Sequence, residues 1–159
     1  MERVERIIPP NVPKAIGPYY PVTAVGDLIF ISGQIPVNPE TNIVEYEDIE
    51  RQTHQVMKNL KAAAEGADSC MNNLAKCTIL LTDMNNFNAV NDIYASYFEA
   101  GKYPARACFS VVGLPKNVKI EIEAVAVRNA IGDHLKKKVK EEWLSIQLQK
   151  FWNPVYSSL

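Results

Sequence analysis

The stretch Y-P-A-R-A-C-F-S-V-V-G-L-P-K-N-V-K-I-E-I-E-A-V-A-V, from Tyr103 to Val127, decides the expected fold. Its two ends are rich in β-branched and apolar residues, and Gly and Pro punctuate the middle, a pattern that predicts a β-hairpin. The predicted arms are Arg106–Val112 and Val118–Val127, joined by a turn over residues 113–117. We expect the rest of the chain to be organised around this hairpin.

Alternation along the predicted arms brings charged and polar groups together. Arg106 and Cys108 share one face of the first arm, because successive side chains of a strand point to opposite faces. If the turn is symmetric about Leu114 and Pro115, Cys108 faces Glu121 across the ladder, and Arg106 lies diagonally beside Glu121. The expected hairpin therefore gathers a guanidinium, a thiol and a carboxylate on an apolar framework, which makes it a candidate site.

Arg106 and Glu121 are the two candidates for chemistry. An arginine presents a planar fork that matches a carboxylate bidentately and stays charged at any working pH. A purely structural salt bridge to Glu121 or Glu123 remains the alternative for Arg106. A partly desolvated Glu121 could serve as an acid or base near neutral pH. The alternative for Glu121 is a solvent-facing residue on a half-exposed strand.

The remaining candidates are polar groups beside apolar segments. Cys108 could be a nucleophile, because a nearby arginine lowers the pKa of a thiol. The predicted hairpin contains no histidine to act as its base, so a lining or hydrogen-bonding role, or that of a small buried hydrophobe, is favoured. Tyr19, Ser32 and Asn91 could line a pocket, or could cap turns and satisfy the backbone.

The order of predicted elements indicates an α+β domain. Residues 1–18 are extended and proline-rich, and strands over 22–25 and 28–35 form a hairpin about Gly26 and Asp27. A helix begins at Asp48 and runs to about Glu65, a strand covers 74–81, and a second helix follows Asp83. With the central hairpin, these elements predict a mixed sheet with two helices packed on one face.

The composition of the chain limits the classes of partner that it is expected to bind. The chain has 159 residues, 47% of them hydrophobic, and a formal net charge of −1, which gives no electrostatic footprint for nucleic acid or an anionic membrane. No apolar run reaches the length of a membrane span, and the N-terminus lacks the apolar core of a secretory signal. We therefore expect a cytoplasmic protein, with import into an organelle left open, and no membrane partner.

Cysteine and histidine counts bear on cofactors. The three cysteines, Cys70, Cys77 and Cys108, match no zinc spacing, and free thiols are the simplest interpretation. The chain has two histidines, and no phosphate-cradling glycine loop is present. We expect neither a metal nor a cofactor.

Residues 129–159 differ in character from the rest and form the second predicted region, after a domain over 1–128. Lys136, Lys137, Lys138 and Lys140 lie among apolar residues at helical spacing (Leu135, Val139, Trp143 and Ile146), which predicts a charged amphipathic helix to about Lys150 and an irregular end. A helix that packs back on the domain, or a loose tail, is the favoured interpretation. A contact with another subunit or a partner is the alternative.

Four segments carry a resemblance to a known family. They are A-I-G-P-Y at 15–19, I-S-G-Q-I-P-V-N-P at 31–39, D-M-N-N-F-N-A-V-N-D-I-Y at 83–94, and the Pro-Ala-Arg stretch that begins at Pro104. Together they resemble the RidA/YjgF family of reactive-intermediate deaminases, also called L-PSP endoribonucleases or translation inhibitors. The resemblance covers about residues 5–128. The tail and the G-K-Y sequence before Pro104 depart from the family pattern.

The resemblance implies a chorismate-mutase-like fold, assembled as a homotrimer with sites between neighbouring subunits. Carried over by motif, Arg106 resembles the family's carboxylate-binding arginine, and Glu121 its water-positioning acid. Tyr19, Ser32, Asn91 and Cys108 resemble the pocket lining.

The activity implied is hydrolysis of 2-enamine and 2-imino acids, such as 2-aminoacrylate and 2-iminobutanoate, to 2-keto acids and ammonia, without a cofactor. An endoribonuclease or translation inhibitor is one alternative, although the net charge does not favour it. A non-catalytic trimer that binds small carboxylates is the other.

Overall fold

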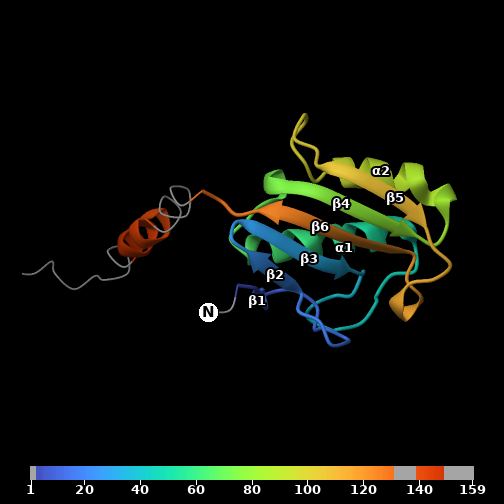
Figure 1. The fold of residues 1–159 in the computed structure, drawn as a ribbon, viewed down its shortest axis with the longest axis horizontal. Coiled ribbons are helices and arrows are strands. Elements are labelled where there is room, and N and C mark those ends of the chain that lie inside the picture. Colours follow the sequence, from blue (N-terminus) through green and yellow to red (C-terminus); the bar gives the residue numbers. More distant parts are fainter. Residues whose placement is uncertain (1–2, 131–138, 149–159) are drawn as a thin grey trace, which may run out of the picture. The chain divides into compact units, whose positions relative to one another are not determined.

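The computed structural model describes residues 3–130 and 139–148. The chain divides into two compact units, 1–128 and 129–159. The first unit is built on one six-stranded sheet in the order β1-β2-β3-β6-β4-β5 (Figure 1). Its strands are β1 (Glu5–Ile7), β2 (Val22–Val25), β3 (Leu28–Gln34), β4 (Leu74–Leu81), β5 (Ala105–Ser110) and β6 (Ile120–Val127). All neighbours pair antiparallel except β4 and β5, which are parallel, so the predicted mixed α+β sheet is confirmed.

The predicted hairpin between the arms at 106–112 and 118–127 is wrong. β4 lies between β5 and β6, and its Leu80 pairs with Phe109 on one side and with Glu121 on the other. The physical reason is the helix between β4 and β5, because a strand–helix–strand unit returns the second strand parallel to the first. The connection after β5, with a 3-10 turn at Pro115–Asn117, then passes the end of β4 to reach β6.

Two helices cover one face of this sheet (Figure 1). The first, α1 (Ile49–Glu65), begins where expected, because Oδ1 of Asp48 accepts a hydrogen bond of 2.8 Å from the backbone N–H of Arg51. Gly66 ends it, as predicted. The second, α2 (Phe87–Ala95), follows a 3-10 turn at Met84–Asn86 and connects β4 to β5.

The two faces of the sheet differ in character. The face toward the helices is fully buried and aliphatic, with Ile29 and Ile31 of β3, Ile79 of β4 and Ile122 of β6. The opposite face is half-exposed yet also apolar, and carries Leu28, Phe30, Phe109 and Val127 with 39–56% of each residue exposed. A half-exposed row of large apolar side chains is unusual for a monomer and typical of an interface.

The β2–β3 hairpin is as predicted, and β3 carries a bulge near its end. Gly26 and Asp27 form the two-residue turn, and Gly26 has the positive φ of +59° that such a turn favours. The register of β3 on β6 shifts between Ile31 and Gln34, which marks a bulge at residues 32 and 33. The bulge places two residues of β3 opposite one of β6 and presents their backbone next to Glu121.

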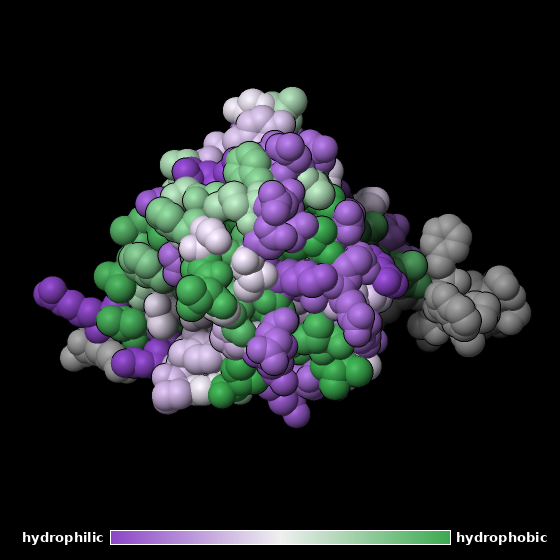
Figure 2. Space-filling model, turned by 90° about the vertical axis from the view of Figure 1, so that its right-hand side faces the viewer, coloured by the Kyte–Doolittle hydropathy of each residue, from purple (hydrophilic) through white to green (hydrophobic). Residues whose placement is uncertain are grey.

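The surface at the end of the sheet on the right of Figure 1 is chemically mixed. Figure 2 shows apolar patches interleaved with polar ones on this side of the molecule. No helix in the described part of the chain is long and apolar enough to cross a membrane.

In the second unit the structure describes a helix over residues 139–148. Val139, Trp143 and Ile146 on this helix are exposed. The predicted start near Asp133 and the predicted end near Lys150 both lie outside the described residues.

Candidate active site

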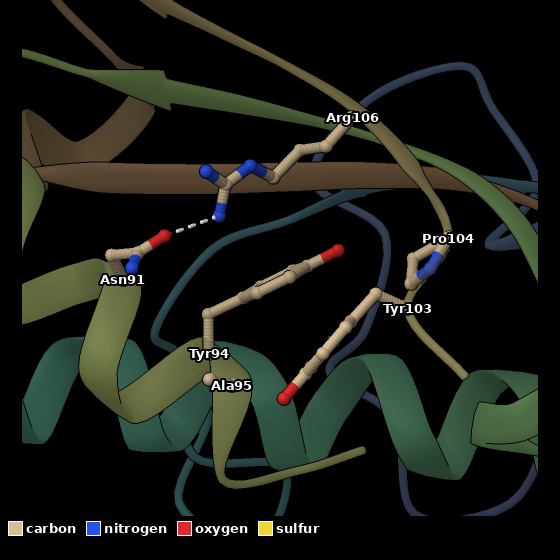
Figure 3. Close-up of a pocket in the computed structure, with 6 residues that line it drawn as sticks. All are labelled: Asn91, Tyr94, Ala95, Tyr103, Pro104 and Arg106. Atoms are coloured by element: carbon tan, nitrogen blue, oxygen red, sulfur yellow. Dashed lines mark hydrogen bonds between the residues drawn. The ribbon is translucent and has the colours of Figure 1, made fainter. Parts of the chain in front are cut away.

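One side of α2 holds the guanidinium of Arg106 (Figure 3). Nη1 of Arg106 donates a hydrogen bond of 2.8 Å to Oδ1 of Asn91. The guanidinium carbon lies 5.1 Å from the centre of the Tyr94 ring and 5.5 Å from that of Phe87. Because residues 87, 91 and 94 lie four and three apart, they share one side of the helix. α2 thus fixes this positive charge with one hydrogen bond and two aromatic faces.

The guanidinium remains available to a ligand. Arg106 is exposed, and among the described residues no carboxylate forms an ion pair with it. The structural salt bridge that the sequence left open is therefore absent from this part of the chain. An arginine has five N–H donors, and Asn91 takes one of them, so the rest of the fork can bind an anion.

A cavity of about 440 Å³ opens beside this arginine, between α2 and the start of β5. Its wall combines one cation, one amide and two phenol rings with small apolar groups (Figure 3). The lining residues are Asn91, Tyr94, Ala95, Tyr103, Pro104 and Arg106. Such a mixture of apolar walls and a few placed polar groups is typical of small-molecule sites.

A second, smaller pocket of about 200 Å³ contains Glu121, Tyr19 and Ser32. The hydroxyl of Tyr19 accepts a hydrogen bond of 3.3 Å from the backbone N–H of Ile16. Oγ of Ser32 donates one of 2.7 Å to the carbonyl of Tyr20. Both hydroxyls are thus held in place by backbone groups, and the oxygen of Ser32 can still accept a hydrogen bond.

Glu121 lies directly against the backbone of Gly33, at the bulge of β3. A Cβ atom built on Gly33 would come within 1.9 Å of Oε1 of Glu121, so a side chain at this position would force the carboxylate to move. Burial, and secondarily the negative charge of Glu123, raise the pKa of Glu121 above the ordinary value of 4.5. A half-buried carboxylate with a raised pKa can exchange a proton closer to neutral pH than an ordinary glutamate.

The structure separates the two charged candidates that the sequence placed side by side. Arg106 and Cys108 pair with Cys77 and Ile79, whose side chains face the helices. Glu121 lies between Ile120 and Ile122 of β6, which are buried toward the helices, so its own side chain points to the opposite face. Within one chain, Arg106 and Glu121 therefore share no cleft, and the expected diagonal contact is wrong.

Cys108 also lies elsewhere than expected. Its partner across the ladder is Ile79, not Glu121, and it packs against the hydrophobic core. Burial raises the pKa of the Cys108 thiol above 9.0, and the positive charge of Arg106 only partly offsets this. A thiol with a raised pKa is a poor nucleophile at neutral pH. Cys108 lines neither of the two pockets described above.

Sequence reasoning missed part of both pockets. The contacts of Phe87 and Tyr94 with the guanidinium were not predicted from the sequence. Tyr103 was noted only as part of the G-K-Y departure from the family pattern, and Gly33 was interpreted either as a bulge or as a point where another group approaches the backbone closely. The sequence signal was the spacing of Phe87, Asn91 and Tyr94 on one face of the helix. It becomes informative only when Arg106 of β5 is known to lie beside α2. Among the described residues, no cluster of histidine, cysteine and carboxylate side chains could hold a metal.

Comparison with known proteins supports the fold and the motifs. The family model described as Endoribonuclease L-PSP matches residues 10–128. A RutC family protein of Pyrococcus horikoshii is 46% identical over 124 residues, which cover 78% of this chain and 98% of that protein. The chain belongs to the L-PSP endoribonuclease family, which includes the RidA and YjgF proteins.

Two further L-PSP family members bear on function. An Escherichia coli protein named 2-iminobutanoate/2-iminopropanoate deaminase is 45% identical over 120 residues, covering 74% of this chain and 93% of that protein. The crystal structure of the Escherichia coli YjgF gene product has a TM-score of 0.74 and 42% identity, and the match covers 79% of this chain and 99% of that one. The chorismate-mutase-like α+β fold is thereby confirmed.

Proposed function

We propose that this protein hydrolyses 2-imino acids to 2-keto acids and ammonia, in a homotrimer whose sites form between neighbouring subunits. The observation that carries the proposal is the exposed guanidinium of Arg106, held by α2 and unpaired by any described carboxylate, at the edge of a cavity. Its chemistry suits the carboxylate of a small acid. The relative named 2-iminobutanoate/2-iminopropanoate deaminase supports the reaction class.

The opposite placement of Arg106 and Glu121 is the reason for an assembly. The two groups can act on one ligand only if they come from different chains, because the sheet separates them within one chain. The half-exposed apolar face that carries Phe30 and Phe109 supplies a surface for association. A head-to-tail ring gives each site an arginine from one subunit and a glutamate from the next.

The chemistry needs few groups. Arg106 binds the carboxylate of the substrate and orients its C=N carbon. Glu121 positions a water molecule and accepts its proton as the oxygen attacks the protonated imine carbon. The proton then passes to the departing nitrogen, so that the C=NH₂⁺ group and one water become C=O and NH₄⁺. The raised pKa of Glu121 suits a group that takes up and returns a proton in one cycle.

The test is a coupled assay in which a pyridoxal-phosphate dehydratase releases the imine in situ, and keto acid is measured with and without this protein. Keto acid should form faster in the presence of the wild-type protein than it does spontaneously. Arg106→Ala should lose about a hundredfold in kcat/KM, since it removes a charge-assisted bidentate contact. Lys102→Ala is the matched control, because Lys102 is also cationic and exposed but is paired with Glu99. The proposal is refuted if the wild-type protein does not raise the rate of keto-acid formation above the spontaneous rate, or if Arg106→Ala is fully active.

The alternative suggested by the family description, RNA cleavage, has weaker support. The lining of neither pocket includes a histidine, and His54 bonds through Nδ1 to the hydroxyl of Tyr97 at 2.9 Å. The net charge of −1 offers little attraction to a phosphate backbone. RNA cleavage that requires Arg106 and Glu121 would favour this alternative, whereas cleavage that persists without them would point to another protein in the preparation.

A further inference from the structure

We propose that Tyr94 is a positioning residue for Arg106 in carboxylate binding, and that it acts through the face of its ring and not through its hydroxyl. This inference rests on the proposed function, since it assigns the carboxylate to Arg106. The ring lies in the wall of the cavity, and its centre is 5.1 Å from the guanidinium carbon (Figure 3). The residue itself is only 3% exposed, so the ring cannot swing away into solvent.

The ring of Tyr94 is held by aromatic packing and by its place on α2. It packs on Phe98 with ring centroids 4.9 Å apart, and Phe98 in turn meets Tyr103 edge-on at 6.1 Å. The backbone of Tyr94 belongs to the last turn of α2, next to the core. A rigid aromatic face under a guanidinium restricts the long arginine side chain before a ligand binds. An unrestricted arginine would lose that rotamer freedom on binding, at a cost in free energy. A ligand would therefore meet an arginine that is already oriented.

The hydroxyl of Tyr94 has no comparable role. It is buried, and the group that lies against it is the thiol of Cys77. The thiol of Cys77 lies near enough to influence the pKa of Tyr94, and burial is the main cause of the large upward shift of that pKa. The phenol thus stays neutral at any working pH. A thiol is a weak hydrogen-bonding group, so this hydroxyl adds little to the stability of the folded state.

The contributions of Asn91 and Tyr94 to Arg106 are different in kind. Asn91 accepts a hydrogen bond from Nη1 and fixes one corner of the fork. Tyr94 supports the plane of the guanidinium and leaves its N–H groups free for a ligand. Loss of Asn91 should therefore rotate the fork, whereas loss of the Tyr94 ring should let the whole side chain move. Both effects should weaken carboxylate binding more than they slow the attack of water.

The test compares two substitutions that separate ring from hydroxyl. Tyr94→Phe keeps the ring, and Tyr94→Leu removes it while filling the core. Binding of 2-oxobutanoate, a keto-acid product, is measured by calorimetry, and KM and kcat are measured in the coupled assay. We expect Tyr94→Phe to bind 2-oxobutanoate within about twofold of the wild type and to have nearly the same stability, because it loses only a weak contact with the thiol of Cys77. We expect Tyr94→Leu to bind about tenfold more weakly and to raise KM with little change in kcat.

Val90→Ala is the control for a general loosening of α2. Val90 is buried on the same helix but is not among the residues that line the cavity, so its variant should lose stability and keep its affinity for 2-oxobutanoate. If Arg106→Ala binds 2-oxobutanoate as tightly as the wild type, the proposed function itself fails. If Arg106→Ala loses binding while Tyr94→Leu keeps it, the role of Tyr94 alone is refuted. Weak binding by Tyr94→Phe would show that the hydroxyl, not the ring, carries the effect.

Discussion

Arg106 and Glu121 lie on opposite faces of one sheet, with β4 between the strands that carry them. The helix-facing cavity holds the arginine, and the pocket on the other face holds the glutamate. The sheet is too well packed between them for a ligand to pass, since Ile79 and Ile122 are at most 1% exposed. Any chemistry that uses both groups must therefore bring a second chain to each site.

The fit of Glu121 over Gly33 gives a first prediction. Gly33→Ala should displace the carboxylate, because the added Cβ would lie 1.9 Å from Oε1, and misplacement of a water-positioning group by about 1 Å lowers the rate about a hundredfold. The loss should fall on kcat, with binding of 2-oxobutanoate nearly unchanged. Gly113→Ala is the control, because a Cβ there meets no atom within 4 Å. Full activity of Gly33→Ala would show that the carboxylate is not needed at this place.

The neighbouring carboxylate of Glu123 provides a second prediction, on pH dependence. The negative charge of Glu123 is one cause of the raised pKa of Glu121, so Glu123→Gln should lower that pKa. Because the ionised form of Glu121 accepts the proton of water, activity falls as the pH drops through this pKa. The acidic limb of the pH profile of kcat/KM should thus move to lower pH. Glu99→Gln, an exposed carboxylate paired with Lys102, should leave it in place. An acidic limb that stays where it is in Glu123→Gln would refute the role of this charge.

The same shift has a consequence for stability. A glutamate whose pKa is raised in the folded state binds more protons there than in the unfolded chain. The contribution of Glu121 to stability is therefore lost as the pH rises from the ordinary value of 4.5 through the raised pKa. Glu121→Gln should flatten the stability profile in that window, as measured by urea unfolding at several pH values. A variant with the same slope as the wild type would contradict a raised pKa.

The buried side-chain amide of Asn59 on α1 gives a prediction on stability. Nδ2 of Asn59 donates hydrogen bonds of 3.0 and 2.9 Å to the carbonyls of Ile35 and Val37, and holds the chain after β3 against the helix. Asn59 is 1% exposed, so Asn59→Ala leaves two buried carbonyls without this donor and should cost about 2–4 kcal/mol. Chemical unfolding measures the loss. Lys58→Ala, exposed on the same helix, should change stability by less than about 0.5 kcal/mol. A similarly small effect of Asn59→Ala would show that this amide is dispensable.

Local patterns predicted the elements of the first unit well, because each is determined by nearby residues. The cap at Asp48, the turn at Gly26 and Asp27, and the strand Leu74–Leu81 follow from side chains within a few positions. The short strand Glu5–Ile7 was read as extended chain, since its pairing with β2 depends on residues far along the chain.

Strand pairing and the geometry of the site could not be predicted from local patterns. Two apolar runs joined by a Gly–Pro turn satisfy the pattern of a hairpin, yet the preceding strand and helix offer β5 a better partner in β4. Through Ile79 of β4, Cys108 aligns with Ile122 and not with Glu121, and this difference of one residue puts Glu121 on the other face of the sheet because side chains alternate. The identity of the candidate residues survived as a prediction, whereas their mutual distance within one chain did not.

A mixing experiment tests the composite site most directly. Arg106→Ala and Glu121→Ala chains, each inactive alone, are unfolded together, refolded as a mixture and assayed for imine hydrolysis. If each site takes Arg106 from one chain and Glu121 from the next, random mixing in a closed ring restores about a quarter of the wild-type sites, and activity returns. If both residues act within one chain, every site keeps a defect, and a mixture as inactive as its two components would contradict the account.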